Sequence, residues 1–268
     1  MWRYIKLMVD YIPFMNQLRK KINNQYHGKI IFLTISGADL YGFKSSDSDT
    51  DFRGCFQVRT NKLLGLHQPK NRMEYKVDKN GVETNEQKLV DKEAELHELA
   101  EVLGQIVKGN CNTYEHIFAE PLESSIEHQE LKDLTEHLWY AKGLYNSYHG
   151  MAYQNYTKFI LGGKHSAKKY LYVLRGLLAG VYALKERRIE PNLEKLNELF
   201  NEPVISELID LKRRRLEKDP VKHMDKYDQC CDKYFKEIRL LGDQIKDEKP
   251  DEKIADTWLK EQRLEYLD

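Results

Sequence analysis

Three aspartates, Asp47, Asp49 and Asp51, stand at alternate positions in the run SDSDTDFRG, shortly after a glycine in the stretch TISGADLYGFKS. On a strand alternate residues share a face, so Asp49 and Asp51 point the same way. Like charges on one face repel each other, and aspartate is disfavoured in strands. The spacing therefore predicts that a cation lies between these carboxylates.

The chemistry expected of such a pair is phosphoryl transfer. Mg²⁺ prefers oxygen ligands, and proteins usually hold it with one or two carboxylates plus the phosphates of a substrate. Two such ions about 3.5 to 4 Å apart would stabilise both the attacking and the leaving oxygens. A polar surface loop or a calcium-binding turn is the alternative. An EF-hand loop is excluded, because its sixth position requires glycine and counting from Asp47 gives Phe52.

A phosphate-binding turn is predicted just before the aspartates. Residues 29–36, KIIFLTIS, form a short apolar run typical of a strand buried on both faces. Gly37 follows it and would let backbone N–H groups approach a phosphate, while the Ser36 hydroxyl adds a donor. The buried strand, this turn and a second strand expected at 51–58 favour the metal site over the surface loop.

The rest of the chain shows two kinds of sequence pattern, mixed strand and helix first and helical afterwards. A helix is expected at 11–26, and a hairpin around Asn80-Gly81 at 73–90. A further strand then leads into an amphipathic helix at 96–110, which Gly109 ends. Residues 125–265 show helical periodicity, including 168–188, and predict five or six helices with breaks at Pro191, Pro203 and Pro220.

Composition limits the function classes. The 41% of hydrophobic residues can build a core, and a formal net charge of +0 excludes an overall field that attracts nucleic acid or acidic membranes. Apolar runs are too short to cross a bilayer, so we expect a cytoplasmic protein without membrane contact. The four cysteines form no CxxC pair and are interpreted as reduced thiols.

The stretch SGADLYGFKSSDSDTDFRG resembles the signature of the DNA polymerase β nucleotidyltransferase superfamily, and more narrowly the RNA repair pathway DNA polymerase β family of phages and bacteria. Further segments also resemble that family: ELHELAEVLGQIVKGNCNTYEHIF, SYHGMAYQNYTKF and KKYLYVLRGLLAG. The resemblance implies an α+β fold, in which a nucleotidyltransferase domain with a small mixed sheet spans residues 1–122. An all-helical domain would follow at 123–268.

The resemblance also assigns roles near the aspartates. Asp49 and Asp51 match the two metal-binding carboxylates, and Ser36 and Gly37 match the phosphate turn. The third carboxylate, a ligand or general base, falls on Glu93, with Glu95 as an alternative on the same strand face. The implied cofactor is Mg²⁺ or Mn²⁺, and the implied substrate is an NTP.

Two residues depart from the family pattern. Ala38 stands where a serine normally follows the glycine, which removes a hydroxyl that would hold phosphate. Glu93 stands where aspartate is commoner. Both departures leave open a weakened enzyme, or a protein that binds its nucleotide without turnover.

Cationic residues supply the remaining candidates for phosphate binding. Lys168 and Arg175 are seven residues apart, so they share one face of the predicted helix and could steady a triphosphate; a solvated basic face is the alternative. Lys158 belongs to a second cluster with Tyr148, Gly150 and Gln154, in which tyrosine could stack on a base, although aromatic residues at helical spacing are more often core. Arg53 could contact phosphate or pair with Asp51.

The sequence thus predicts a two-metal nucleotidyltransferase that moves an NMP from an NTP to a hydroxyl acceptor. The resemblance implies that the acceptor is an RNA end, a tRNA end included. The alternative is a catalytically weak module that binds a nucleotide or an RNA end in a repair or toxin–antitoxin assembly.

Overall fold

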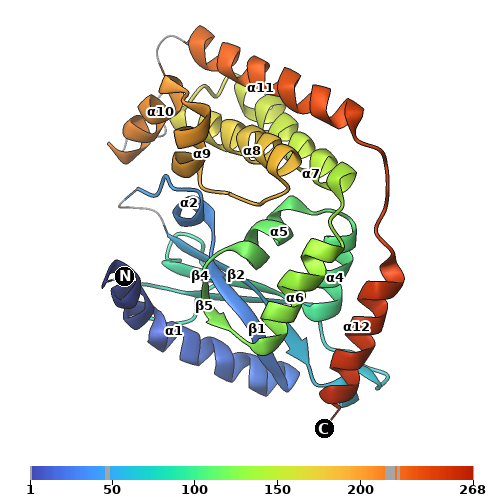
Figure 1. Cartoon of the computed structure of the whole chain (residues 1–268). Coiled ribbons are helices and arrows are strands. Elements are labelled where there is room, and N and C mark those ends of the chain that lie inside the picture. The colour runs from blue at the N-terminus through green and yellow to red at the C-terminus, as the bar shows by residue number, and fades with distance from the viewer. Residues whose placement is uncertain (1, 46–48, 215–220, 222–223, 268) are drawn as a thin grey trace.

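The computed structural model describes residues 2–45, 49–214, 221 and 224–267, with side chains from residue 10 onward. Within these ranges the chain has the predicted α+β class: a small mixed sheet flanked by helices, followed by a helical C-terminal region (Figure 1). Asp47 lies outside the described residues. No helix in the described part of the chain is both long and apolar enough to cross a membrane.

The described part of the chain contains one five-stranded sheet, in the order β3-β4-β2-β1-β5. Strands β2 and β4 are parallel, and the other neighbouring pairs are antiparallel. This pairing sets β2, which carries Asp51 and begins just after Asp49, directly beside β4, which carries both candidate glutamates. The strands are β1 Gly28–Ile35, β2 Thr50–Val58, β3 Arg72–Val77, β4 Lys92–Glu98 and β5 Pro121–Ser124.

Helices cover both faces of this sheet. The helices of the N-terminal half are α1 Trp2–Tyr26, α2 Gly37–Leu40, α3 Thr60–Leu63, α4 Leu99–Val107 and α5 Cys111–Phe118. They are followed by α6 Ile126–His137, α7 Ala141–Asn155, the π-helical turn η1 Tyr156–Ile160, α8 Ala167–Glu186, α9 Leu193–Phe200, α10 Pro203–Arg213, α11 Met224–Gln244 and α12 Glu252–Glu265.

Two clusters of buried side chains hold these layers together. Helix α1 packs Phe14 and Leu18 against one face of the sheet, where the rings of Phe14 and Phe52 stack with centroids 4.8 Å apart. The opposite face contributes Ile31 and Cys55 to a second cluster that continues through α8 into α11. The apolar runs of β1 and β2 are therefore explained by burial on both faces.

Helix α8 is the centre of the helical half. It packs against α7, α10 and α11 (Figure 1), and its residues 173–181 are buried without a break. A helix that is buried on all sides leaves only its ends free to meet solvent or ligand. The second cluster joins this helix to the sheet, so the predicted division between residues 122 and 123 does not interrupt the core and stays a prediction.

The C-terminal helix α12 returns to the sheet side of the molecule (Figure 1). The buried side chain of Gln57 donates from Nε2 to the carbonyl oxygen of Gln262 at 2.9 Å, and the Thr60 hydroxyl donates to that of Arg263 at 2.6 Å. The Arg263 guanidinium pairs with Glu98 at 2.7 Å. The last helix thus fastens the end of β2 to the end of β4.

The strands predicted at 29–36 and 51–58 and the helices at 11–26 and 168–188 are confirmed, with ends shifted by up to nine residues. Gly109 ends the helical region after α4 in a left-handed conformation, with φ +69°. The reduced state expected of the cysteines agrees with four buried free thiols.

Four details of the fold differ from expectation. The Asn80-Gly81 turn is followed by a single bridge between Val77 and Glu83, and β3 instead pairs along its length with β4. The helix expected from residue 96 begins at Leu99, because residues 96–98 complete β4. Strand β5 was not expected, since its four residues carry no clear strand signal. The described part of residues 125–265 holds seven α-helices rather than five or six.

Candidate active site

Asp49 and Asp51 lie at the entrance to β2. Asp49 is exposed just before the strand, and Asp51 is half-buried within it. The carbonyl oxygen of Asp51 accepts a hydrogen bond from the Ser36 N–H at 2.8 Å. This bond ties the residue before the glycine turn to the residue that carries the second carboxylate.

The glycine turn makes room for the Asp51 carboxylate. Gly37 has φ +62°, a left-handed conformation that glycine adopts without strain. A Cβ atom built on Gly37 would lie 2.3 Å from Asp51 Oδ2. The carboxylate therefore occupies the space that any other side chain at position 37 would fill.

The two candidate glutamates lie on β4, the strand that pairs with β2. In the parallel register Asp51 is opposite Glu93, and Arg53 is opposite Glu95. Lys76 Nζ approaches Glu93 at 3.6 Å. Glu95 is more firmly held, because Arg72 and His97 contact it at 2.9 and 3.2 Å. Glu93 is thus the carboxylate in register with Asp51, and Glu95 is the one with the stronger protein partners.

Negative charge is crowded around Asp51. Burial raises the pKa of the Asp51 carboxyl, Arg53 opposes that shift, and the carboxylates of Asp49, Glu93 and Asp39 raise the pKa further. In contrast, the hydrogen bond from His97 lowers the pKa of Glu95. The strain at Asp51 is of the kind that a bound cation relieves.

The oxygen donors around Asp51 fit a hard divalent cation such as Mg²⁺ or Mn²⁺. Among the residues that the structure describes, no three His, Cys, Asp or Glu side chains form a ready-made metal cluster. Such an ion usually completes its coordination with water and substrate phosphates.

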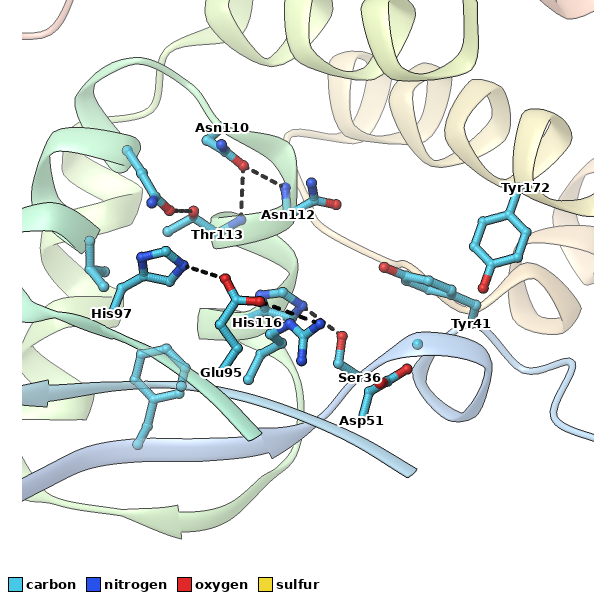
Figure 2. Close-up of a pocket in the computed structure, with 16 residues that line it drawn as sticks. Ser36, Tyr41, Asp51, Glu95, His97, Asn110, Asn112, Thr113, His116 and Tyr172 are labelled. Carbon is cyan, nitrogen blue, oxygen red and sulfur yellow. Dashed lines mark hydrogen bonds and ion pairs between the residues drawn. The ribbon is translucent and has the colours of Figure 1, made fainter. Parts of the chain in front are cut away.

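A cavity of about 380 Å³ opens beside Ser36, Gly37 and Asp51. Figure 2 shows Tyr41 and Tyr172 on one side of it and the start of α5 on the other. Its volume lies in the range of small-molecule and cofactor sites. Further residues that line it are Phe32, Arg53, Gly54, Glu95, His97, Val102, Gln105, Asn110, Asn112, Thr113 and His116.

Comparison with known proteins decides what this site is related to. A model of the RNA repair pathway DNA polymerase beta family matches residues 13–261. The chain belongs to this family. The uncharacterized protein YcgL of Bacillus subtilis (strain 168) is 26% identical over 240 residues, which cover 87% of this chain and 88% of YcgL. As its name implies, this polymerase β family groups nucleotidyltransferase-like proteins linked to RNA repair.

In this member of the RNA repair pathway polymerase β family, the structure brings together most residues predicted around the aspartates. Ser36, Gly37, Asp51 and Arg53 line the cavity, and so does Glu95. Asp49, on the exposed approach to β2, and Glu93 are not among the lining residues. Arg53 donates to the carbonyl oxygen of Phe52 at 2.9 Å and lies 3.7 Å from Glu95. It therefore pairs with Glu95 and not with Asp51.

The cations predicted in the helical half lie elsewhere. Lys158 is exposed on η1, and Lys168 is half-exposed in the first turn of α8; neither lines the cavity. Arg175 was expected to face the cleft, but it is 2% exposed and both Glu115 carboxylate oxygens lie 2.7 Å from its Nη1. The correction has a physical reason, since α8 is buried on all sides and its arginine needs a buried carboxylate.

Arg175 nevertheless supports one wall of the cavity. Its guanidinium carbon lies 3.9 Å from the centroid of the Tyr41 ring. Tyr41 in turn approaches Tyr172 of α8 edge-on, with centroids 6.1 Å apart. The buried Arg175–Glu115 pair thus supports Tyr41, which together with Tyr172 forms the aromatic side of the cavity.

Several cavity residues carry no signal in the sequence. His116 is the clearest, because its Nε2 lies 2.9 Å from the Ser36 hydroxyl oxygen. Burial, with Arg53 and Arg175 nearby, lowers the pKa of His116 to about 3, so the imidazole is neutral at pH 7. Asn110 was detectable in principle, since it follows Gly109 and its side chain caps α5. Tyr172 and His116 are recognisable only once distant elements are folded together.

Proposed function

We propose that this chain is a metal-dependent nucleotidyltransferase that moves an NMP from an NTP to a hydroxyl acceptor at an RNA end. The observation that carries the proposal is the contact between the Gly37 turn and the Asp51 carboxylate. It joins a phosphate-binding turn to a crowded carboxylate, and Glu93 lies opposite on the neighbouring strand. Membership of a polymerase β-like family supports the same reaction class.

In this proposal the turn binds the triphosphate. Backbone N–H groups of the turn at Gly37 would donate to phosphate oxygens, and the Ser36 hydroxyl adds a hydrogen bond. His116 holds that hydroxyl in place. Tyr41, Tyr172 and the polar residues at the start of α5 would then enclose the nucleoside.

In this proposal the carboxylates bind the metal ions that act on the reacting oxygens. Asp49, Asp51 and Glu93 would hold Mg²⁺ or Mn²⁺, which would stabilise charge on the attacking and leaving oxygens of the displacement. Glu93, which is in register with Asp51, acts as a further ligand or accepts the proton of the attacking hydroxyl. The acceptor oxygen gains the bond to the α-phosphorus, and pyrophosphate leaves with the electrons of the broken bond.

A transfer assay tests this proposal. Each of the four labelled NTPs would be incubated with Mg²⁺ or Mn²⁺ and with RNA or DNA ends that carry 3′-hydroxyl or 3′-phosphate groups. The wild type would be compared with the double variant Asp49→Asn/Asp51→Asn and with Asp256→Asn. Asp256 is a suitable control because it is an exposed aspartate on α12, far along the chain from β2.

We expect labelled product from the wild type and the Asp256 variant, and none from the double variant. Product at one kind of end would also identify the acceptor and the base. Nucleotide binding without product at any nucleic-acid end would instead support a sensor or another acceptor. It would therefore count against the proposed reaction.

A further inference from the structure

Positive charge is concentrated in one part of this neutral chain. Aspartate and glutamate total 43 of 268 residues, yet none occurs between Glu136 and Glu186. That stretch forms α7, η1 and α8. Its cationic residues are Lys142, Lys158, Lys164, Lys168, Lys169, Arg175 and Lys185. Arg175 is buried and paired with Glu115, and Lys185 pairs with Glu237, so the other lysines form the basic surface. A local basic surface within a neutral protein indicates an anionic partner.

Three of these lysines gather around one ring at the junction of η1 and α8. The ammonium groups of Lys158, Lys164 and Lys169 lie 5.3, 6.0 and 3.6 Å from the centroid of Phe159. We call these four residues the lysine patch. Lys158 and Lys164 are exposed, and neither has an ion-pair partner within the described ranges of the chain.

Such an arrangement favours a polyanion. Lys158 and Lys164 both lie beside the Phe159 ring, and a bound row of phosphates would give each of them an ion-pair partner. Asp228 and Asp232 of α11 place negative charge near Tyr156, and the Tyr170 hydroxyl donates a hydrogen bond to Asp228 at 2.8 Å. The phosphates would therefore contact the patch on the exposed side of Lys158 and Lys164. The π-helical geometry of η1 is itself a feature that occurs frequently at functional sites.

Helix α8 connects the lysine patch to the cavity. Tyr172 lines the cavity, and Lys168 precedes it by four residues, so both lie on the same face of the helix. Lys168 lies in the first turn of α8, next to Lys169, and the turn that precedes the helix carries Lys164; both Lys164 and Lys169 approach Phe159. A nucleic-acid strand whose end lies in the cavity can therefore run along this helix toward the lysine patch.

We infer that the lysine patch binds the phosphate backbone of a single-stranded RNA whose terminal hydroxyl enters the cavity. This inference rests on the proposed function for the identity of the reacting end. It gives Lys158 and Lys164 a partner that a nucleotide in the cavity does not supply. A single strand is favoured because the end must share a cavity of about 380 Å³ with the nucleotide.

The test measures binding and does not need turnover. A fluorescently labelled 12-nucleotide single-stranded RNA would be titrated, without NTP, into the Asp51→Asn protein at several salt concentrations. The same measurement would be made after adding Lys158→Gln, Lys164→Gln and Lys169→Gln. The matched control would carry Lys236→Gln, Lys253→Gln and Lys260→Gln, which remove the same charge from exposed positions on α11 and α12. Circular dichroism would verify that all variants are folded.

We expect the lysine-patch variant to lose affinity at least about tenfold, and its salt dependence to weaken by about 2 in the slope of log K against log salt. The control variant should match the parent. Equal affinities in both variants would overturn the inference. So would equally tight binding of a duplex of the same length, or a loss of NTP affinity while RNA affinity is kept. Because the Asp51→Asn protein is used throughout, failure of the transfer reaction would not produce any of these results.

Discussion

At the scale of single residues, the position of the Asp51 carboxylate depends on the absence of a side chain at Gly37. We expect Gly37→Ala to destabilise the protein in two ways: by about 1–2 kcal/mol for a left-handed alanine, and further because the new methyl group displaces the Asp51 carboxylate. A displacement of about 1 Å at a reacting group can lower turnover about 100-fold. Urea unfolding and the transfer rate would measure the two effects.

Gly81→Ala is the matched control. Gly81 has φ +78°, but a Cβ atom there would meet nothing within 4 Å. The control should show the cost of the backbone conformation alone and keep full activity. Equal stability losses in the two variants, with activity preserved in both, would show that the contact with Asp51 is unimportant.

Glu93 and Glu95 make different contacts, so their substitutions should lower turnover to different extents. We expect Glu93→Gln to lower turnover about 10²- to 10⁴-fold, the range for a lost general base, because Glu93 lies opposite Asp51. Glu95→Gln should have a smaller effect on turnover although Glu95 lines the cavity, since Arg72, His97 and Arg53 already pair with its carboxylate. Single-turnover rates at saturating NTP would measure both. The reverse order would assign the third carboxylate to Glu95.

The sequence predicts residues of the site when they are close together along the chain. Ser36, Gly37 and Asp51 belong to one strand–turn–strand unit, so their spacing alone brings them together at the cavity. Arg175 shows the limit: its partner Glu115 is 60 positions away, and nothing local distinguishes a buried paired arginine from one that faces a cleft.

At the scale of elements, His128 joins three parts of the fold. Its Nδ1 accepts a hydrogen bond from the Ser124 hydroxyl at 2.8 Å, and its Nε2–H donates to the Ile117 carbonyl at 3.0 Å. The ring also stacks on Phe32, with centroids 4.6 Å apart. Helix α6 is thereby joined to β5, α5 and β1.

Burial lowers the pKa of His128 from 6.5 to about 4. Below pH 6.5 the unfolded chain takes up a proton at this residue while the folded protein does not, so stability must fall as the pH falls. We expect this residue to contribute a loss of about 1.4 kcal/mol per pH unit between pH 6.5 and about 4.

Urea unfolding of the wild type and of His128→Gln across that range would isolate the contribution. The variant should be less stable at pH 7 and show a shallower decline toward acid pH. Parallel pH profiles would mean that His128 does not remain neutral in the folded protein.

Helices and strands with a strong hydrophobic periodicity are predictable from the sequence, and those with a weak periodicity are not. Helix α8 and strands β1 and β2 carry long apolar patterns and were expected close to their positions. Strand β5 has only four residues, with a proline and a glutamate among them, and it exists because β1 offers it an edge. The boundary between β4 and α4 was misplaced, since an apolar pattern through residues 96–99 suits either element.

At the scale of the whole molecule, α12 closes the structure by returning to the sheet. Glu98 is 4% exposed, and Arg263 supplies its ion-pair partner. We expect Arg263→Gln to cost about 2–3 kcal/mol, below the usual 3–5 for a broken buried pair, because Glu98 still accepts hydrogen bonds from the Val58 and Ala100 N–H groups.

Equilibrium unfolding in urea would measure that cost. Arg188→Gln is the control, since Arg188 is exposed and its substitution should change stability by less than about 0.5 kcal/mol. Similar values for the two variants would show that α12 is not needed to hold the sheet. The pair joins residues 165 positions apart, which explains why the sequence gives no sign of it.

The most direct test of the central claim is the fate of the phosphates of the NTP. The nucleotide would be labelled in parallel at the α- and the γ-phosphate and offered to the acceptor found in the transfer assay. If the site at Asp51 transfers a nucleotidyl group, the α-label enters the product with one pyrophosphate released per transfer, the γ-label never does, and Asp51→Asn abolishes both events. Transfer of the γ-label, or transfer that survives in Asp51→Asn, would contradict it.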